Sequence, residues 1–76
     1  MKHLSFSYQG ARALGDNRPA ITVMRELGIK YQSFLPHKID DSCWFWNCGN
    51  IPEALPEYIT ELNIITPLDF VHNLLD

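Results

Sequence analysis

Two cysteines and a nearby histidine are the first residues in this 76-residue chain that could do chemistry. Cys43 and Cys48 follow His37 in the middle of the sequence. Zinc-binding cysteine pairs are usually placed on a tight turn, where both sulfurs converge. Here the two cysteines flank Trp-Phe-Trp-Asn, a pattern typical of a strand, and positions five apart on a strand point to opposite faces. We therefore expect two reduced, packed thiols, no metal ion and no other cofactor.

Other residue types that could catalyse a reaction lack the local context that catalysis needs. Asp41, Ser42 and Cys43 supply candidate groups, but no glycine-flanked turn presents a nucleophile. Gly10 and Gly15 lack the Lys-Ser/Thr sequence that follows in a phosphate-binding loop. A chain of this length also has little room for a buried substrate pocket. We expect a protein that is not an enzyme.

The aromatic run Trp44-Phe45-Trp46 is a candidate binding surface. On a strand, both tryptophans share one face and Phe45 takes the other. Either Phe45 is core and the tryptophans lie outside, or the reverse holds. Exposed tryptophans would form an apolar patch of the kind that marks a partner site. Because so small a core needs large side chains, we expect at least one of the two rings to be buried.

Acidic residues in the second half form the other candidate surface. Glu53, Glu57 and Glu61 are four residues apart, so on the helix expected there they would stack along one side. Asp40 and Asp41 add two carboxylates just before the aromatic run. A solvated outer face is the simpler interpretation, and a ladder of carboxylates that docks on basic side chains is the functional one.

Charge is divided unevenly along the chain. Residues 1–38 contain all six Lys and Arg residues and two acidic residues, which gives a net charge of +4. Residues 39–76 contain seven acidic residues and no Lys or Arg, which gives a net charge of −7. The halves either neutralise each other within the fold or leave an exposed acidic face that attracts a basic partner. The dispersed basic residues and the overall charge of −3 oppose direct nucleic-acid binding.

Length and composition indicate one small soluble domain over residues 1–76, with 46% apolar and 20% charged residues. The apolar stretches are far shorter than a membrane span, and the N-terminus does not have the pattern of a signal peptide. We expect a cytoplasmic protein.

The first half of the chain predicts a strand, a helix and a second strand. Residues 2–8 alternate with period two, and residues 10–17 are typical of a loop. A helix follows, capped by Asp16 or Asn17 with Pro19 in its first turn, and Gly28 with Ile29 predicts a Schellman stop. The apolar stripe of this helix consists of Ala20, Val23, Met24 and Leu27.

The second half predicts one more strand and two helices. Residues 29–35 and 43–48 are expected to pair as strands, followed by a helix over 52–62 and a last helix over 66–75. The apolar set of the last helix is Leu68, Val71, Leu74 and Leu75, with Phe70 beside it. The order β-α-β-β-α-α predicts an α+β fold of two layers, a small, mainly antiparallel three-stranded sheet with helices on one face.

Together, these sequence features indicate a class of protein but not a named activity. We expect a non-enzymatic protein-interaction module whose acidic half, with the tryptophans, docks on a basic surface of a nucleic-acid-handling protein. In size and charge it is comparable to the small acidic inhibitors of phages and mobile elements. The alternatives are a self-associating protein, in which the basic half of one copy meets the acidic half of another, and a small metal- or nucleic-acid-binding domain.

Overall fold

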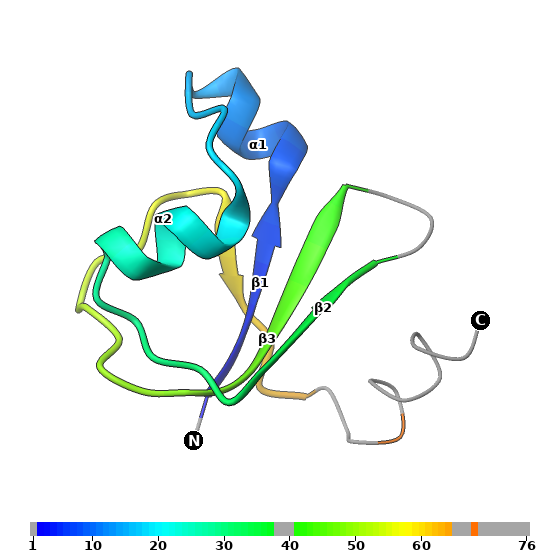
Figure 1. Cartoon of the computed structure of the whole chain (residues 1–76), viewed down its shortest axis with the longest axis vertical. Coiled ribbons are helices and arrows are strands. Elements are labelled where there is room, and N and C mark those ends of the chain that lie inside the picture. Colours follow the sequence, from blue (N-terminus) through cyan, green and yellow to red (C-terminus); the bar gives the residue numbers. More distant parts are fainter. Residues whose placement is uncertain (1, 38–40, 65–67, 69–76) are drawn as a thin grey trace.

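One antiparallel sheet and two short helices make up the fold in the computed structural model, which describes residues 2–37, 41–64 and 68 (Figure 1). The elements are β1 (Lys2–Ser7), α1 (Tyr8–Ala13), α2 (Ala20–Glu26), β2 (Ser33–Pro36), β3 (Ser42–Cys48) and β4 (Ile59–Glu61). The strands are ordered β2-β3-β1-β4, and all neighbours are antiparallel. The predicted α+β class is confirmed, with four strands in the sheet where three were expected.

The strand β1 continues without a loop into the helix α1. Leu4 and Phe6 are buried on one face of β1, as the alternating pattern predicts. At the end of the strand, the Ser7 side-chain oxygen accepts a hydrogen bond from the Gly10 N–H at 3.2 Å and caps the helix. Ala11 is buried beneath this turn. The sequence predicted a loop here, because a six-residue helix that contains a glycine has a weak local signal.

The helix α2 is the element that the sequence predicted best. Ala20, Val23 and Met24 are buried along one side. The helix ends in the expected Schellman motif: the Gly28 N–H donates to the Arg25 carbonyl and the Ile29 N–H to the Met24 carbonyl. Gly28 has φ +76°, the left-handed conformation that this motif requires. The N-terminus differs, since Pro19 is the cap residue and no side chain caps the helix.

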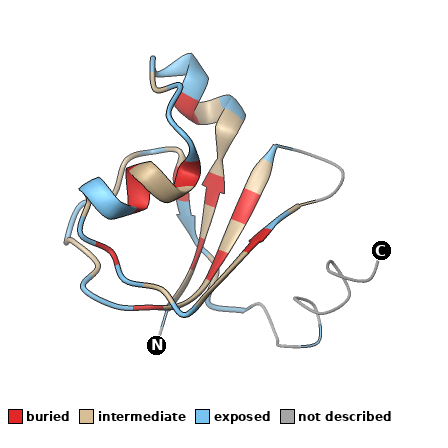
Figure 2. Cartoon of the chain, viewed as in Figure 1, coloured by how far each residue is buried: buried red, intermediate tan, exposed pale blue. Residues whose placement is uncertain are grey.

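Both helices cover the same face of the sheet. Their buried residues belong to one core cluster with the inward side chains of β1, β3 and β4. Figure 2 shows buried positions on both helices and on the central strands β1 and β3. The cluster contains Leu4, Phe6, Ala11, Ala20, Val23, Met24, Ile29, Cys43, Phe45, Cys48 and Ile59. Phe45 lies at its centre, fully buried, with the rings of Tyr31 and Phe34 at 4.9 and 5.1 Å. The opposite side of the sheet is the one that neither α1 nor α2 covers, and in this sense alone we call it the helix-free face.

The second strand begins later than expected. The structure places β2 at 33–36 instead of 29–35. Before it, an isolated bridge joins Lys30 to Gly49, and the Gln32 N–H donates to the Trp46 carbonyl at 2.9 Å. Pro36 ends the strand at an edge of the sheet, where its missing N–H is tolerated.

A bulge in β3 decides which side chains of its C-terminal end are buried. Leu4 pairs with Phe45, but Lys2 pairs with Cys48, so three residues of β3 oppose two of β1. Asn47 takes the extra position with φ 53°, and its N–H donates to His3 Nδ1 at 3.3 Å. The bulge returns Cys48 to the buried face. The expectation that Cys43 and Cys48 point to opposite faces is therefore wrong, because it assumed a regular strand.

The predicted helix over 52–62 is also wrong. Residues 51–58 form no regular element, and residues 59–61 form β4, which pairs with β1. The Ile59 N–H donates to the Pro56 carbonyl in a turn, and the Ser7 N–H donates to the Tyr58 carbonyl. Pro56 disfavours a continuous helix, while strand pairing satisfies the other edge of β1 and buries Ile59. The last predicted helix, 66–75, lies outside the described residues except for Leu68.

Replacement of Phe45 by alanine should lower the free energy of unfolding by about 3–5 kcal/mol, because the cavity would lie at the centre of the core. A core of this size supplies only roughly that much stability, so the variant should be largely unfolded at 25 °C. Urea unfolding followed by circular dichroism measures the loss. The control is Leu14→Ala, at a side chain that is 59% exposed and should change stability by about 0.5 kcal/mol or less. Equal stability of the two variants would contradict this description of the core.

Candidate functional site

The predicted acidic residues lie along one segment, residues 51–61, which we call the acidic segment. The side chains of Ile51, Leu55 and Tyr58 are partly buried against the core cluster, and Ile59 is buried within it. The acids Glu53, Glu57 and Glu61 alternate with these anchors and are all exposed. The three carboxylates are thus directed toward solvent by apolar residues between them, and not by the helical stacking that the sequence predicted.

The three glutamates differ in their ion pairing. Glu61 lies 3.2 Å from the Lys2 ammonium and accepts a hydrogen bond from the Asn63 amide at 2.8 Å. The Asn63 hydrogen bond and then Lys2 lower the pKa of Glu61 from its ordinary value. Glu53 and Glu57 form no ion pair with any described residue. They are the carboxylates of this segment whose charge the described fold leaves uncompensated.

The acids before β3 are not joined to the acidic segment by any described contact. Asp41 pairs with the Arg12 guanidinium of α1 at 2.9 Å, and its backbone carbonyl accepts the Tyr8 N–H. Asp40 lies outside the described residues. The charge of Asp41 is therefore compensated within the fold.

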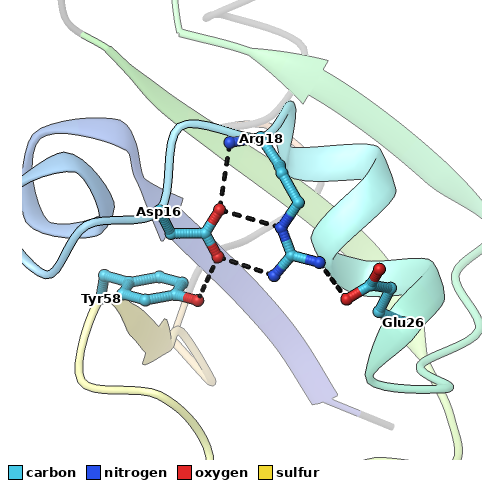
Figure 3. Close-up of polar contacts among 4 residues, drawn as sticks. All are labelled: Asp16, Arg18, Glu26 and Tyr58. Atoms are coloured by element: carbon cyan, nitrogen blue, oxygen red, sulfur yellow. Dashed lines mark hydrogen bonds and ion pairs between the residues drawn. The ribbon is translucent and has the colours of Figure 1, made fainter.

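Tyr58 anchors the acidic segment through both its ring and its hydroxyl group. Its ring packs edge-on against Phe6 with the centroids 5.1 Å apart. Tyr58 passes so close to α1 that a Cβ on Gly10 would lie 3.0 Å from the Tyr58 Cβ, so a larger residue there would push the two segments apart by a few tenths of an ångström. The hydroxyl group donates to Asp16 at 3.0 Å (Figure 3).

Asp16 is the centre of a polar network that also holds Arg18 (Figure 3). The Arg18 guanidinium donates to both carboxylate oxygens, at 3.1 and 2.8 Å, and the Arg18 backbone N–H donates at 3.0 Å. Arg18 also pairs with Glu26 at the end of α2. The side-chain and then the backbone hydrogen bonds of Arg18 hold the pKa of Asp16 far below its usual range. The network joins the loop before α2 to the acidic segment.

The sequence did not indicate this network. Asp16 or Asn17 was expected to cap α2, but the Asp16 carboxylate accepts a hydrogen bond from the Arg18 N–H two residues later, in the manner of an Asx turn. The Asp-x-Arg spacing before a proline is the local signal that could have shown this arrangement. Tyr58 had no such signal, because 42 residues separate it from Asp16 and only the fold brings them together.

Trp44 and Trp46 lie on the helix-free face, and Phe45 is the buried aromatic residue of the run. Trp44 is level with Leu35 of β2 and Ser5 of β1, so these side chains share one face. Trp46 stacks on the His3 ring with the centroids 3.8 Å apart, and the His37 ring lies 5.7 Å from Trp44. Both tryptophans are partly buried. The predicted site is thus divided, with the tryptophans on one face and the acidic segment packed on the helix side.

The two cysteines lie inside the core cluster and form no disulfide. Burial raises the pKa of the Cys48 thiol, which disfavours the reactive thiolate. Among the described residues, no three His, Cys, Asp or Glu side chains are grouped so that they could hold a metal ion. The thiols pack as small apolar side chains.

Comparison with protein-family models, with curated proteins and with solved structures finds no match to this chain. Within the described ranges, neither helix has the length and apolar character that a membrane crossing requires. What the chain does has to be inferred from its own residues.

Replacement of Asp16 by asparagine should destabilise the protein at pH 7 and reduce its acid sensitivity. A carboxylate whose pKa is lower in the folded protein than in the unfolded chain stabilises the fold. This stabilisation is complete at pH values above the pKa in the unfolded chain, about 3.9, and it is lost as the pH falls toward the pKa in the folded protein. The stability difference between wild type and variant should be largest at neutral pH and shrink from about pH 5 downward.

Urea unfolding at pH 7, 5 and 3 measures that difference. Glu53→Gln is the matched control, because Glu53 is exposed and has no described ion pair, and it should leave the pH profile unchanged. A constant difference between wild type and Asp16→Asn at all three pH values would show that the carboxylate charge does not stabilise the fold.

Proposed function

We propose that this chain is a non-enzymatic protein-interaction module that docks its acidic segment on a basic surface of another protein. The observation that carries the proposal is the placement of Glu53 and Glu57. Both are exposed, neither pairs with a described cation, and both lie on a segment that is anchored to the core by Ile51, Leu55 and Tyr58. Two carboxylates held outward in this way suit the Arg and Lys side chains of a partner.

The anchoring of the segment supports tight binding with a small entropic cost. A loop that is already fixed does not lose conformational freedom when a partner binds. Pro52 and Pro56 each directly precede one of the two glutamates and restrict the backbone there. The Tyr58 hydroxyl and ring hold the end of the segment, next to Glu57.

The ion pairs of the other charged residues favour a basic protein as the partner over a nucleic acid or a second copy of this chain. Arg12, Arg18 and Lys2 are engaged in ion pairs within the fold, which reduces the positive charge that these residues can offer to nucleic-acid phosphates. The ion pairs Lys2–Glu61 and Arg12–Asp41 also join the basic and acidic halves of a single chain. That neutralisation leaves less charge for self-association between copies.

The proposal assigns binding, and no catalysis, to the chain. One hollow among the described residues, lined by Ser7, Gln9, Asp41 and Ser42, has a volume of about 140 Å³, which is smaller than the pockets of roughly 300–1,000 Å³ that hold small-molecule ligands. The biological form we favour is an inhibitor that masks the basic surface with which a partner holds nucleic-acid phosphates, as small acidic phage proteins do. We place this chain in the cytoplasm, where its two free thiols would stay reduced.

The double variant Glu53→Gln, Glu57→Gln should weaken binding to a basic probe, mainly through slower association. An arginine-rich synthetic peptide serves as the probe, with rates measured by surface plasmon resonance. Raising the salt from about 50 to 500 mM should weaken the wild type in the same way, because the Debye length shrinks to a few Å.

The matched control is Glu26→Gln, Asp41→Asn, which removes the same net charge from acids that are already ion-paired. It should weaken binding less than the test variant. Equal weakening by both variants would mean that only net charge matters, which would overturn the assignment to the acidic segment. With the wild type and the test variant as parallel baits in a lysate of the native host, mass spectrometry should find a basic protein that is retained by the wild type alone.

A further inference from the structure

The acidic segment ends in β4, an edge strand of the sheet with no described strand beyond it (Figure 1). β4 and β1 are joined through alternate residues of each strand: the Ser7 N–H donates to the Tyr58 carbonyl, and the Leu62 N–H donates to the His3 carbonyl. Backbone groups of successive residues in a strand point in opposite directions. The N–H and carbonyl groups of Glu61 therefore face away from β1, on the outer edge of the sheet.

This outer edge is open along most of β4. The Glu61 N–H, the Glu61 carbonyl and the Ile59 carbonyl have no hydrogen-bond partner among the described residues, whereas the Ile59 N–H donates to the Pro56 carbonyl. An antiparallel strand placed beside Glu61 could accept one hydrogen bond from this edge and donate two to it. Open backbone groups on an edge strand are a template on which another strand can form.

We propose that an extended basic segment of the partner protein adds to this edge as a further strand. The inference rests on the proposed function, because it names the form in which a basic partner meets the acidic segment. Glu61 pairs with Leu4, which is in the core cluster, so its side chain lies on the helix side of the sheet. Its Oε1 atom receives both Lys2 and Asn63, and its Oε2 atom has no described partner. An Arg or Lys opposite Glu61 in the added strand would bind Oε2 as a cross-strand ion pair.

The same added strand can reach Glu57, whose charge the described fold leaves uncompensated. Glu57 comes two residues before β4, which begins at Ile59, and four residues before Glu61. Four residues of extended chain span at most about 13 Å. Alternate residues of a strand have their side chains on one face. Basic residues at alternate positions of the added strand would therefore meet Glu61 and Glu57 from the same side.

Charge favours a basic strand over a second copy of this chain as the occupant. Antiparallel pairing of two β4 edges would bring the glutamates of both copies together, and like charges on neighbouring strands are destabilising. The other edge strand, β2, has the sequence Ser-Phe-Leu-Pro and offers no cation to the β4 edge. Acidic side chains on an edge oppose pairing with most strands, and a basic strand is the one that they attract.

N-methylated peptides test the added strand. The probe is a short extended peptide in which arginine and valine alternate, and its binding to the full-length wild-type protein is measured by calorimetry. A residue that exchanges hydrogen bonds with Glu61 has its side chain on the Glu61 face, so the arginine amides should face β4. Methylation of the arginine amides should weaken binding by roughly tenfold or more, because backbone hydrogen bonds are lost. Methylation of the valine amides is the matched control and should change binding by less than about threefold.

The outcomes separate this inference from the proposed function. If both methylated peptides bind equally well and their binding still depends on Glu53 and Glu57, the added strand is wrong and the proposed function stands. If the unmethylated peptide does not bind, both are wrong.

Hydrogen exchange of the Glu61 amide, followed by NMR, is a second test that needs no variant. In the free protein the Glu61 N–H should exchange faster than the Leu62 N–H, which is bonded to His3. Saturating peptide should slow the exchange of Glu61 by roughly tenfold or more, and by a larger factor than that of Leu62. An unchanged Glu61 rate at saturation would overturn the proposal. Protection of Glu61 that rises with protein concentration in the absence of peptide would also overturn it, because a second copy would then occupy the edge.

Discussion

The pairing of β1 with the bulged strand β3 is the constraint on which the rest of the structure depends. β1 and β3 are the two central strands, and each carries buried side chains on the same face, Leu4 and Phe6 on β1 and Phe45 on β3. A single extra residue, Asn47, shifts the register near the end of β3. That shift places Cys48 inside. The tryptophans precede the shift and lie opposite Phe45 by ordinary strand alternation. With so small a core, the position of each of these side chains decides whether the chain folds.

The core in turn fixes the position of the acidic segment, which carries the exposed glutamates. Tyr58 contacts Phe6 in the core and Asp16 in the loop before α2, so the acidic segment is fixed at the point where it meets the sheet. The bidentate pair between Asp16 and Arg18 keeps that loop in place. Glu57 lies next to Tyr58 in the chain, and its exposure therefore depends on the packing of Tyr58. The proposed contact with a basic partner rests on this link between core and surface.

Local sequence patterns predicted the structure correctly where the residues of a single helix or strand were enough to determine its conformation. The alternation of residues 2–8, the stripe and the Schellman stop of α2, and the separation of Phe45 from Trp44 and Trp46 could all be predicted from spacing. Patterns failed where a distant strand decided the outcome. Residues 59–61 pair with β1 in place of continuing a helix, and Asn47 forms a bulge opposite His3. The acidic residues were identified correctly as exposed, but their arrangement and the anchor at Tyr58 depend on contacts that the sequence does not show.

Thiol accessibility in the native wild-type protein tests the central claim about β3 most directly. A regular strand would place Cys43 and Cys48 on opposite faces, whereas the bulged strand buries both in the same core. We expect both thiols to react with an aromatic disulfide reagent only slowly, at similar rates that rise together when urea unfolds the protein. If Cys48 reacts rapidly under native conditions while Cys43 stays protected, the strand is regular and the account of the two faces is wrong.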